Sequence, residues 1–156
     1  MGYACIVDGI GDGRMTISFS VTGTPVPQLR PRFTRQGHAY DTAKCREYKK
    51  LVAIEAKKAM RGRERLEGAL WCSLTFYMAI PKSLSQKKRR ELTGAFVVKK
   101  PDTDNLAKSV MDSMIGIVYT DDAQIARLIS EKRYGEVPRV EVMIDVLWEV
   151  NNEICA

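Results

Sequence analysis

The segment K-K-P-D-T-D-N-L-A-K-S-V-M-D-S-M-I-G-I-V-Y-T-D-D-A-Q-I, residues 99–125, is the part of the sequence that says most about the fold. Pro101 has a fixed φ and biases Lys100 away from the helical conformation. The sequence therefore predicts a helix from about Asn105 to Ile115, with Asp104 as its N-cap, because a carboxylate is favoured near the positive end of a helix dipole. At about 100° per residue this helix has an apolar side and an opposite polar side, namely Leu106, Val110, Met114 and Ile117 against Asn105, Lys108, Ser109 and Asp112.

The acidic residues of this segment are candidates for a metal site. If residues 102–104 are extended, Asp102 and Asp104 point the same way, with α-carbons ~6.5–7 Å apart. A loop that folds back after the helix brings Asp121 or Asp122 toward them. Three carboxylates that close repel each other, and a hard cation such as Mg²⁺ or Mn²⁺ removes that cost. Lys108 lies one turn after Asp104 and is placed to stabilise the charge that develops in a phosphodiester reaction.

The same residues also have a purely structural interpretation. Asp104 is then a plain helix cap, Lys108 and Asp112 form an i,i+4 pair, and Asp121 and Asp122 are turn residues. The charge distribution argues against it: residues 30–100 hold 19 Lys and Arg against 6 Asp and Glu, whereas residues 101–156 hold 5 against 11. A basic middle beside an acidic last third indicates a polyanion-binding surface next to a group of carboxylates.

The stretch from Gly23 to Tyr40 is predicted to be a long loop stiffened by its prolines. It contains three arginines, which suit phosphate contacts, and two aromatic residues, which suit base stacking: Arg30, Arg32, Arg35, Phe33 and Tyr40. The alternative is a surface loop whose aromatic residues anchor it to the core. The basic run Lys87–Arg90 is a weaker candidate for DNA contact, because charge runs on short helices are often only solvated surface.

The remaining periodicity predicts the other elements. A helix capped by Asp41 or Thr42 is expected to reach about Arg61, and a short helix capped by Ser83 or Ser85 is expected to end at Gly94. Alternating or β-rich patterns predict four strands, over residues 15–21, 69–79, 124–134 and 139–149, with a turn at 135–138 between the last two.

These elements predict an α+β single domain with a mixed sheet of about four strands and about three helices. The strand–helix–strand unit over residues 15–79 is expected to be a right-handed crossover if its strands are parallel neighbours. Residues 1–14 show no clean period, so we interpret them as a loose N-terminal extension before a domain over residues 15–156.

Composition excludes several classes of protein. No apolar run approaches the ~20 residues of a membrane helix, and no secretory signal pattern is visible, so we expect a cytoplasmic protein with reduced thiols. The four cysteines form no C-x-x-C pair and the chain has one histidine, which excludes a Cys/His zinc site. A nucleophile–histidine mechanism would have to use His38, which lies in a basic, loop-like stretch.

Taken together, K-P-D-x-D-N-L-x-K-x(3)-D and the following D-D-x-Q-I resemble the RusA-type Holliday junction resolvases. The upstream pattern G-x-P-x-P-x(2)-R-P-R, residues 23–32, is also similar, as is the stretch from Tyr40 through the following helix. The resemblance covers about residues 15–149.

The resemblance implies a small homodimeric, Mg²⁺-dependent endonuclease, with Mn²⁺ as an alternative ion, that nicks two opposed strands of a four-way DNA junction. By motif position it implies Asp102, Asp104 and Asp122 as metal-binding carboxylates and Lys108 as the catalytic lysine. Asp112 also occupies a recurrent family position with an open role, and the choice between Asp121 and Asp122 stays open. Side chains expected to contact DNA are Arg30, Arg32, Arg35, Lys99 and Lys100.

Two other functions compete with this one. The first is a non-catalytic DNA- or RNA-binding module, which would need the same basic surface but no metal. The second is a nucleotide-sugar transferase that uses the D-x-D pair. It is disfavoured because the chain is short for a usual nucleotide-sugar fold and its middle is strongly basic.

Overall fold

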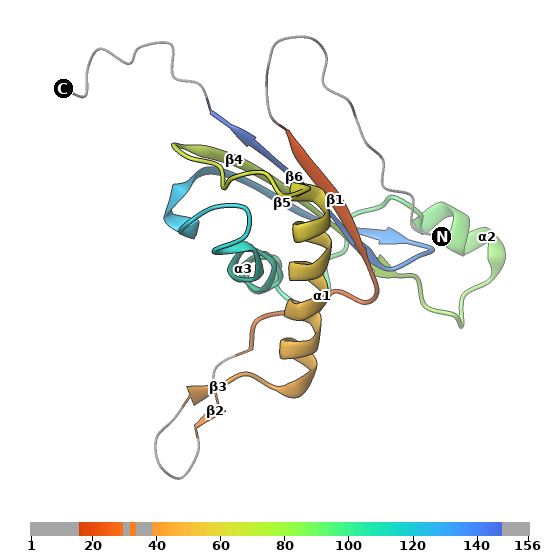
Figure 1. Cartoon of the computed structure of the whole chain (residues 1–156). Coiled ribbons are helices and arrows are strands. Elements are labelled where there is room, and N and C mark those ends of the chain that lie inside the picture. The colour runs from red at the N-terminus through yellow and green to blue at the C-terminus, as the bar shows by residue number, and fades with distance from the viewer. Residues whose placement is uncertain (1–15, 30–31, 34–38, 148–156) are drawn as a thin grey trace.

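The computed structural model of the 156-residue chain describes residues 16–29, 32–33 and 39–147. These residues form a single α+β domain with one mixed four-stranded sheet, a two-stranded ribbon and three α-helices, which confirms the predicted fold class (Figure 1). The strands are β1 (Ile17–Thr22), β2 (Arg32–Phe33), β3 (Ala39–Tyr40), β4 (Leu70–Ala79), β5 (Ile125–Gly135) and β6 (Arg139–Val146). The helices are α1 (Ala43–Met60), α2 (Gln86–Leu92) and α3 (Thr103–Met114), and one 3-10 turn, η1, spans Asp122–Gln124.

The sheet has the strand order β1-β6-β4-β5. Strand β6 pairs antiparallel with both β1 and β4, and β4 pairs parallel with β5. Strands β1 and β4 are therefore parallel to each other but separated by β6, so the expected crossover does not join neighbouring strands. The inserted β6 pairs with a strand on both sides and buries Val140, Val142 and Ile144 in the core.

Strands β5 and β6 follow each other in the chain but do not form a hairpin, because β4 lies between them. The short turn at 136–138 therefore passes the end of β4, where Gly135 pairs with Ala79 and Arg139 pairs with Tyr77. A Cβ added to Gly135 would lie 3.0 Å from the Cβ of Tyr77. This close approach explains why a glycine ends β5.

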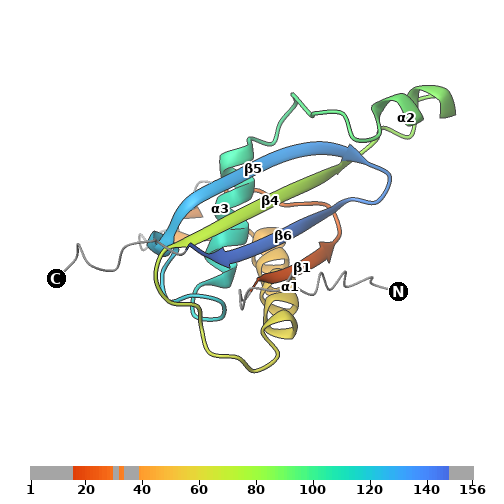
Figure 2. The same ribbon diagram turned by 90° about the horizontal axis from the view of Figure 1, so that it is seen from above.

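Helices α1 and α3 lie side by side over the same face of the sheet (Figure 2). Strand β4 alternates buried and partly buried residues, and its buried side chains meet those of both helices in one core. Each such side chain contributes roughly 1.5–3 kcal/mol when it is fully buried. This packing fixes α3 across the sheet by its apolar side, through Leu106, Val110 and Met114.

Helix ends agree with the predicted caps in two cases and differ in the third. Thr42 caps α1 by accepting from the Cys45 N–H at 3.4 Å, and Ser85 caps α2 by accepting from the Lys88 N–H at 3.4 Å. Helix α3 begins two residues earlier than predicted, with Asp102 as the N-cap, so the assignment of that role to Asp104 is wrong. Pro101 restricts the residue before it, Lys100, and leaves Asp102 free to start a helix.

Two other details of the sequence interpretation need correction. Ser109 is fully buried, although it falls on the side of α3 predicted to be polar, because α1 packs beside α3. The stretch predicted as a structureless loop contains the β2–β3 ribbon, in which Arg32 pairs with Tyr40 and Phe33 with Ala39. The predicted N-terminal extension lies outside the described residues. No helix in the described part of the chain is long and apolar enough to cross a membrane.

Candidate active site

The N-terminus of α3 presents two of the predicted carboxylates to solvent. Asp102 is the N-cap, with extended backbone at φ −72° and ψ 143°, and Asp104 is the second residue of the first helical turn. Both residues are exposed, and neither carboxylate makes a hydrogen bond or ion pair with another described residue. Because the helix already starts at Thr103, the two do not lie on one extended segment as the sequence suggested.

A lysine of the sheet holds the segment that leads into this helix. The Lys132 ammonium, on β5, donates to the carbonyl oxygens of Lys99 and Pro101, both at 2.7 Å. Strand β5 also binds the preceding residues through its backbone, since the Val97 N–H donates to the Lys132 carbonyl at 3.0 Å. The sheet thus positions the segment that immediately precedes Asp102. Sequence analysis did not single out Lys132, whose partners lie more than 30 residues away.

The other end of α3 meets the turn that carries Asp121 and Asp122. The pKa of Asp122 is raised above its ordinary value, first by partial burial and then by contact with the Asp121 carboxyl and by the charges of Asp121 and Asp112. The Lys108 ammonium acts in the opposite direction. These effects place Lys108, Asp112 and Asp122 in one electrostatic environment. Its excess of negative charge is of the kind that a bound cation relieves.

Gln124 fixes the conformation of this turn. Its side-chain oxygen accepts from the backbone N–H groups of Thr120 and Asp121, at 2.8 and 3.2 Å, and its amide nitrogen donates to the Leu66 carbonyl at 3.1 Å. Asp121 and Gln124 form a capping box, and the Asp121 carboxylate also accepts from the Ala123 N–H at 2.9 Å. The spacing of Asp121 and Gln124 is the sequence signal of such a box, and sequence analysis did not use it.

The turn gives its two acidic residues different surroundings. Asp121 uses a carboxylate oxygen to cap η1, whereas Asp122 is the residue whose pKa responds to Asp112 and Lys108. This difference supports Asp122 over Asp121 as a metal ligand. The assignment itself stays a prediction.

The predicted DNA-binding side chains are only partly within the described residues. Lys99 and Lys100 are exposed beside the N-terminus of α3. Arg30 and Arg35 lie outside the described residues, and only the backbone of Arg32 is described. On α2, Arg89 is used within the fold, since it donates to the Pro81 carbonyl at 3.2 Å.

The side chains predicted to bind the metal have the ligand atoms that this metal prefers. Asp102, Asp104 and Asp122 offer only carboxylate oxygens, the ligands that Mg²⁺ and Mn²⁺ prefer. Within residues 16–29, 32–33 and 39–147, no three His, Cys, Asp or Glu side chains are gathered closely enough to hold one ion. Asp102 and Asp104 lie at the N-terminus of α3, whereas the α3 residues whose charges act on the pKa of Asp122 include Lys108 and Asp112. The grouping of these three residues around an ion therefore remains a prediction.

An exposed acidic helix start, a lysine on the next turn and a basic flank are the features from which the sequence predicted a nuclease. The chain matches the family model described as Endodeoxyribonuclease RusA over residues 22–145, which is most of its length. It is also 39% identical over 135 residues to a Bacillus subtilis (strain 168) protein described as "Uncharacterized protein YqaN", across 82% of this chain and 94% of that protein. The chain belongs to the RusA endodeoxyribonuclease family. This membership implies a Holliday junction resolvase, in agreement with the resemblance found from the motifs.

Proposed function

We propose that the protein is a Mg²⁺-dependent endonuclease that resolves four-way DNA junctions by nicking two opposed strands as a homodimer. The observation that carries this proposal is the arrangement along α3. Two exposed carboxylates without a hydrogen bond or ion pair to another described residue stand at its N-terminus, Lys108 lies one turn further, and the Lys108 charge acts on the raised pKa of Asp122. The family match supplies the reaction class.

In this proposal Asp102, Asp104 and Asp122 hold the ion, with Mn²⁺ as an alternative. A bound divalent ion supplies Lewis-acid polarisation of the phosphate and a water of lowered pKa. Lys108 places its ammonium where negative charge develops on the phosphate oxygens. Lys132 and Gln124 keep the two carboxylate-bearing segments in place through their backbone hydrogen bonds.

The exposed Lys99 and Lys100, with the arginines at 30, 32 and 35, would bind junction phosphates. A twofold dimer suits a substrate with two equivalent scissile phosphates. We place this activity in the cytoplasm.

The experiment uses a labelled synthetic four-way junction and a duplex of the same sequence, each with Mg²⁺ or with EDTA. We expect paired nicks in the junction only, and only with Mg²⁺. Asp122→Asn should remove nicking while junction binding persists, whereas Glu136→Gln, at an exposed residue in the turn after β5, should leave nicking unchanged. Binding without nicking by the wild-type protein, in either Mg²⁺ or Mn²⁺, would identify a non-catalytic binding module instead.

Dimerisation is tested separately by light scattering and on a supercoiled plasmid that extrudes a cruciform. Paired incision within one binding event converts that plasmid directly to the linear form. Independent incision by a monomer would accumulate nicked circles first.

A further inference from the structure

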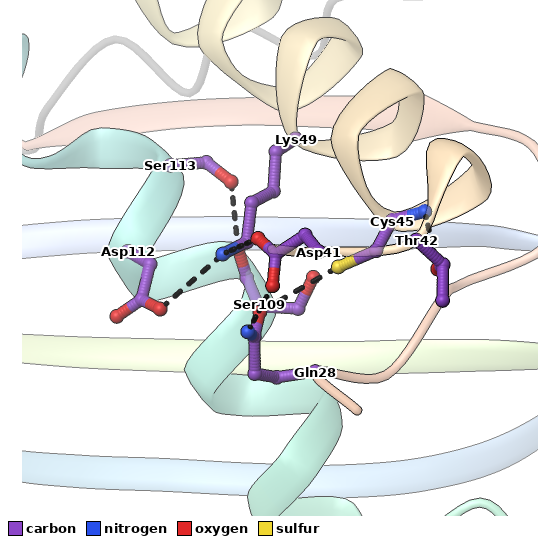
Figure 3. Close-up of polar contacts among 8 residues, drawn as sticks. All are labelled: Gln28, Asp41, Thr42, Cys45, Lys49, Ser109, Asp112 and Ser113. Carbon is purple, nitrogen blue, oxygen red and sulfur yellow. Dashed lines mark hydrogen bonds and ion pairs between the residues drawn. The ribbon is translucent and has the colours of Figure 1, made fainter. Parts of the chain in front are cut away.

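Lys49 of α1 lies between carboxylates from two different elements (Figure 3). Its ammonium nitrogen is 3.0 Å from Oδ2 of Asp41, just before α1, and 3.5 Å from Oδ2 of Asp112, on α3. The three side chains are 21, 23 and 26% exposed for Lys49, Asp41 and Asp112. Partial burial makes such a charge arrangement less screened by solvent than a pair on the open surface.

The second oxygen of Asp41 extends this network to the start of the arginine-bearing stretch. The Gln28 side-chain amide donates to Oδ1 of Asp41 at 2.8 Å and accepts from the Cys45 thiol at 3.5 Å. The Gln28 backbone N–H donates to the Asn105 carbonyl, in the first turns of α3, at 2.8 Å. Two segments of the chain are thus attached to α3 at points on either side of Lys108.

Asp112 therefore differs from Asp102 and Asp104, because among the described residues it has an ion-pair partner, Lys49. Its carboxylate faces the Lys49 ammonium, while its charge still contributes to the raised pKa of Asp122. Asp102 and Asp104 make no ion pair with a described residue. The acidic residues thus divide into solvent-exposed carboxylates at one end of the helix and a paired carboxylate at the other.

We infer that Lys49 is a positioning residue of the proposed active site, holding the Asp112 carboxylate in an ion pair and so keeping it out of the metal-binding set. The inference rests on the proposed function and goes beyond it, because it assigns Asp112 a role and names the α1 residue that imposes it. The ammonium of Lys49 also offsets the charge of Asp112, which is one of the charges that raise the pKa of Asp122.

Two consequences distinguish this arrangement from direct ligation by Asp112. Removal of the Lys49 charge leaves one more uncompensated carboxylate near the ion, so Lys49→Met should tighten Mn²⁺ binding by about two- to fivefold. Asp112→Asn keeps the shape of the side chain and removes no ligand, so Mn²⁺ affinity should fall by less than about threefold. Both variants should nevertheless nick more slowly, because the α1–α3 contact near the site is weakened.

The test is a Mn²⁺ titration of the full chain followed by electron paramagnetic resonance of the free ion, with nicking measured in parallel. The variants are Lys49→Met, Lys49→Arg, Asp112→Asn and Asp122→Asn. Lys50→Met serves as the matched control, since Lys50 is an exposed lysine on the same helix. We expect tighter binding for Lys49→Met, near wild-type binding for Lys49→Arg, Asp112→Asn and Lys50→Met, and a loss of at least tenfold for Asp122→Asn.

Equal losses of Mn²⁺ affinity in Asp112→Asn and Asp122→Asn would overturn the inference, since Asp112 would then be a ligand. So would a Lys50→Met effect as large as that of Lys49→Met, because the cause would then be net charge alone. Lys49→Arg keeps the charge and serves as the folded comparison if Lys49→Met loses its structure by circular dichroism. A wild-type protein that binds Mn²⁺ but does not nick would refute the proposed function and leave these affinity ratios to decide the role of Lys49.

Discussion

Replacement of Lys132 by methionine tests how the sheet positions the N-terminus of α3. The change removes the ammonium that donates at 2.7 Å to the Lys99 and Pro101 carbonyls and keeps most of the side-chain volume. A hydrogen bond to a charged group contributes about 1.5–3 kcal/mol, and ordering a lysine side chain costs up to about 2 kcal/mol. For two such bonds at a partly exposed site we expect a net loss of about 1–2 kcal/mol.

This loss is measurable by two independent assays. Because about 1 kcal/mol shifts the melting temperature of a domain this size by roughly 2–4 °C, Lys132→Met should melt about 2–8 °C lower. Asp102 immediately follows the freed carbonyls, so nicking should fall about 10–100-fold, which is the range that a small misplacement of a catalytic group produces. The affinity for the junction should change little, because the Lys132 ammonium donates to backbone carbonyls and is not among the side chains expected to contact DNA.

Two control variants distinguish the loss of the hydrogen bonds that position the 99–101 segment from the loss of one positive charge. Lys132→Arg retains donors that reach the same carbonyls and should recover most of the activity. Lys57→Met removes one positive charge from an exposed position near the end of α1 and should match the wild type. The reasoning is refuted if Lys132→Met melts and nicks like the wild type, or if Lys57→Met is impaired to the same extent.

Three further predictions concern charge, DNA contact and the chain terminus. The pKa of Asp122 is raised in the folded protein, so ionisation of this carboxyl opposes folding, and without divalent ions Asp122→Asn should have a higher melting temperature than the wild type at pH 7. The difference in melting temperature should vanish as the pH falls below the ordinary carboxyl pKa of 3.8. Thermal scans across pH check this prediction, and equal melting temperatures at pH 7 would contradict it. Arg32→Ala should weaken junction binding and flatten its log–log salt slope by about one unit if Arg32 contacts a single phosphate, as titrations across a salt series would show. Removal of residues 1–13 should leave nicking and unfolding largely unchanged, and a loss of several kcal/mol in urea unfolding would show that these residues pack into the core.

Local signals in the sequence were sufficient for most elements of the fold. Thr42 and Ser85 have the hydroxyl side chains that helix N-caps need, and both act as caps. The β-rich composition of residues 69–79 predicted β4 to within one residue. These features depend on neighbours within a few positions, which is why a single sequence reveals them.

Features that depend on distant partners could not be predicted in the same way. The insertion of β6 between β1 and β4 is decided by which strands bury each other's side chains, and no local pattern encodes it. Lys49 reaches Asp112 across 63 positions, and no helical or strand period links the two. The motif predicted functional roles for Asp102, Asp104, Lys108 and Asp122. The contacts that Lys132 and Lys49 make near them were visible only in the folded chain.

The central place of β6 has a consequence for how the protein is made. This strand is the last described element to leave the ribosome, yet both β1 and β4 pair with it. Before Val146 emerges, the β4–α3–β5 unit can begin to form, but β1 has no partner in the four-stranded sheet and α1 lacks the completed surface on which it packs. We expect a nascent chain that lacks β6 to be unable to support the proposed cutting of DNA, because β1 and α1 are not yet held against the rest of the domain.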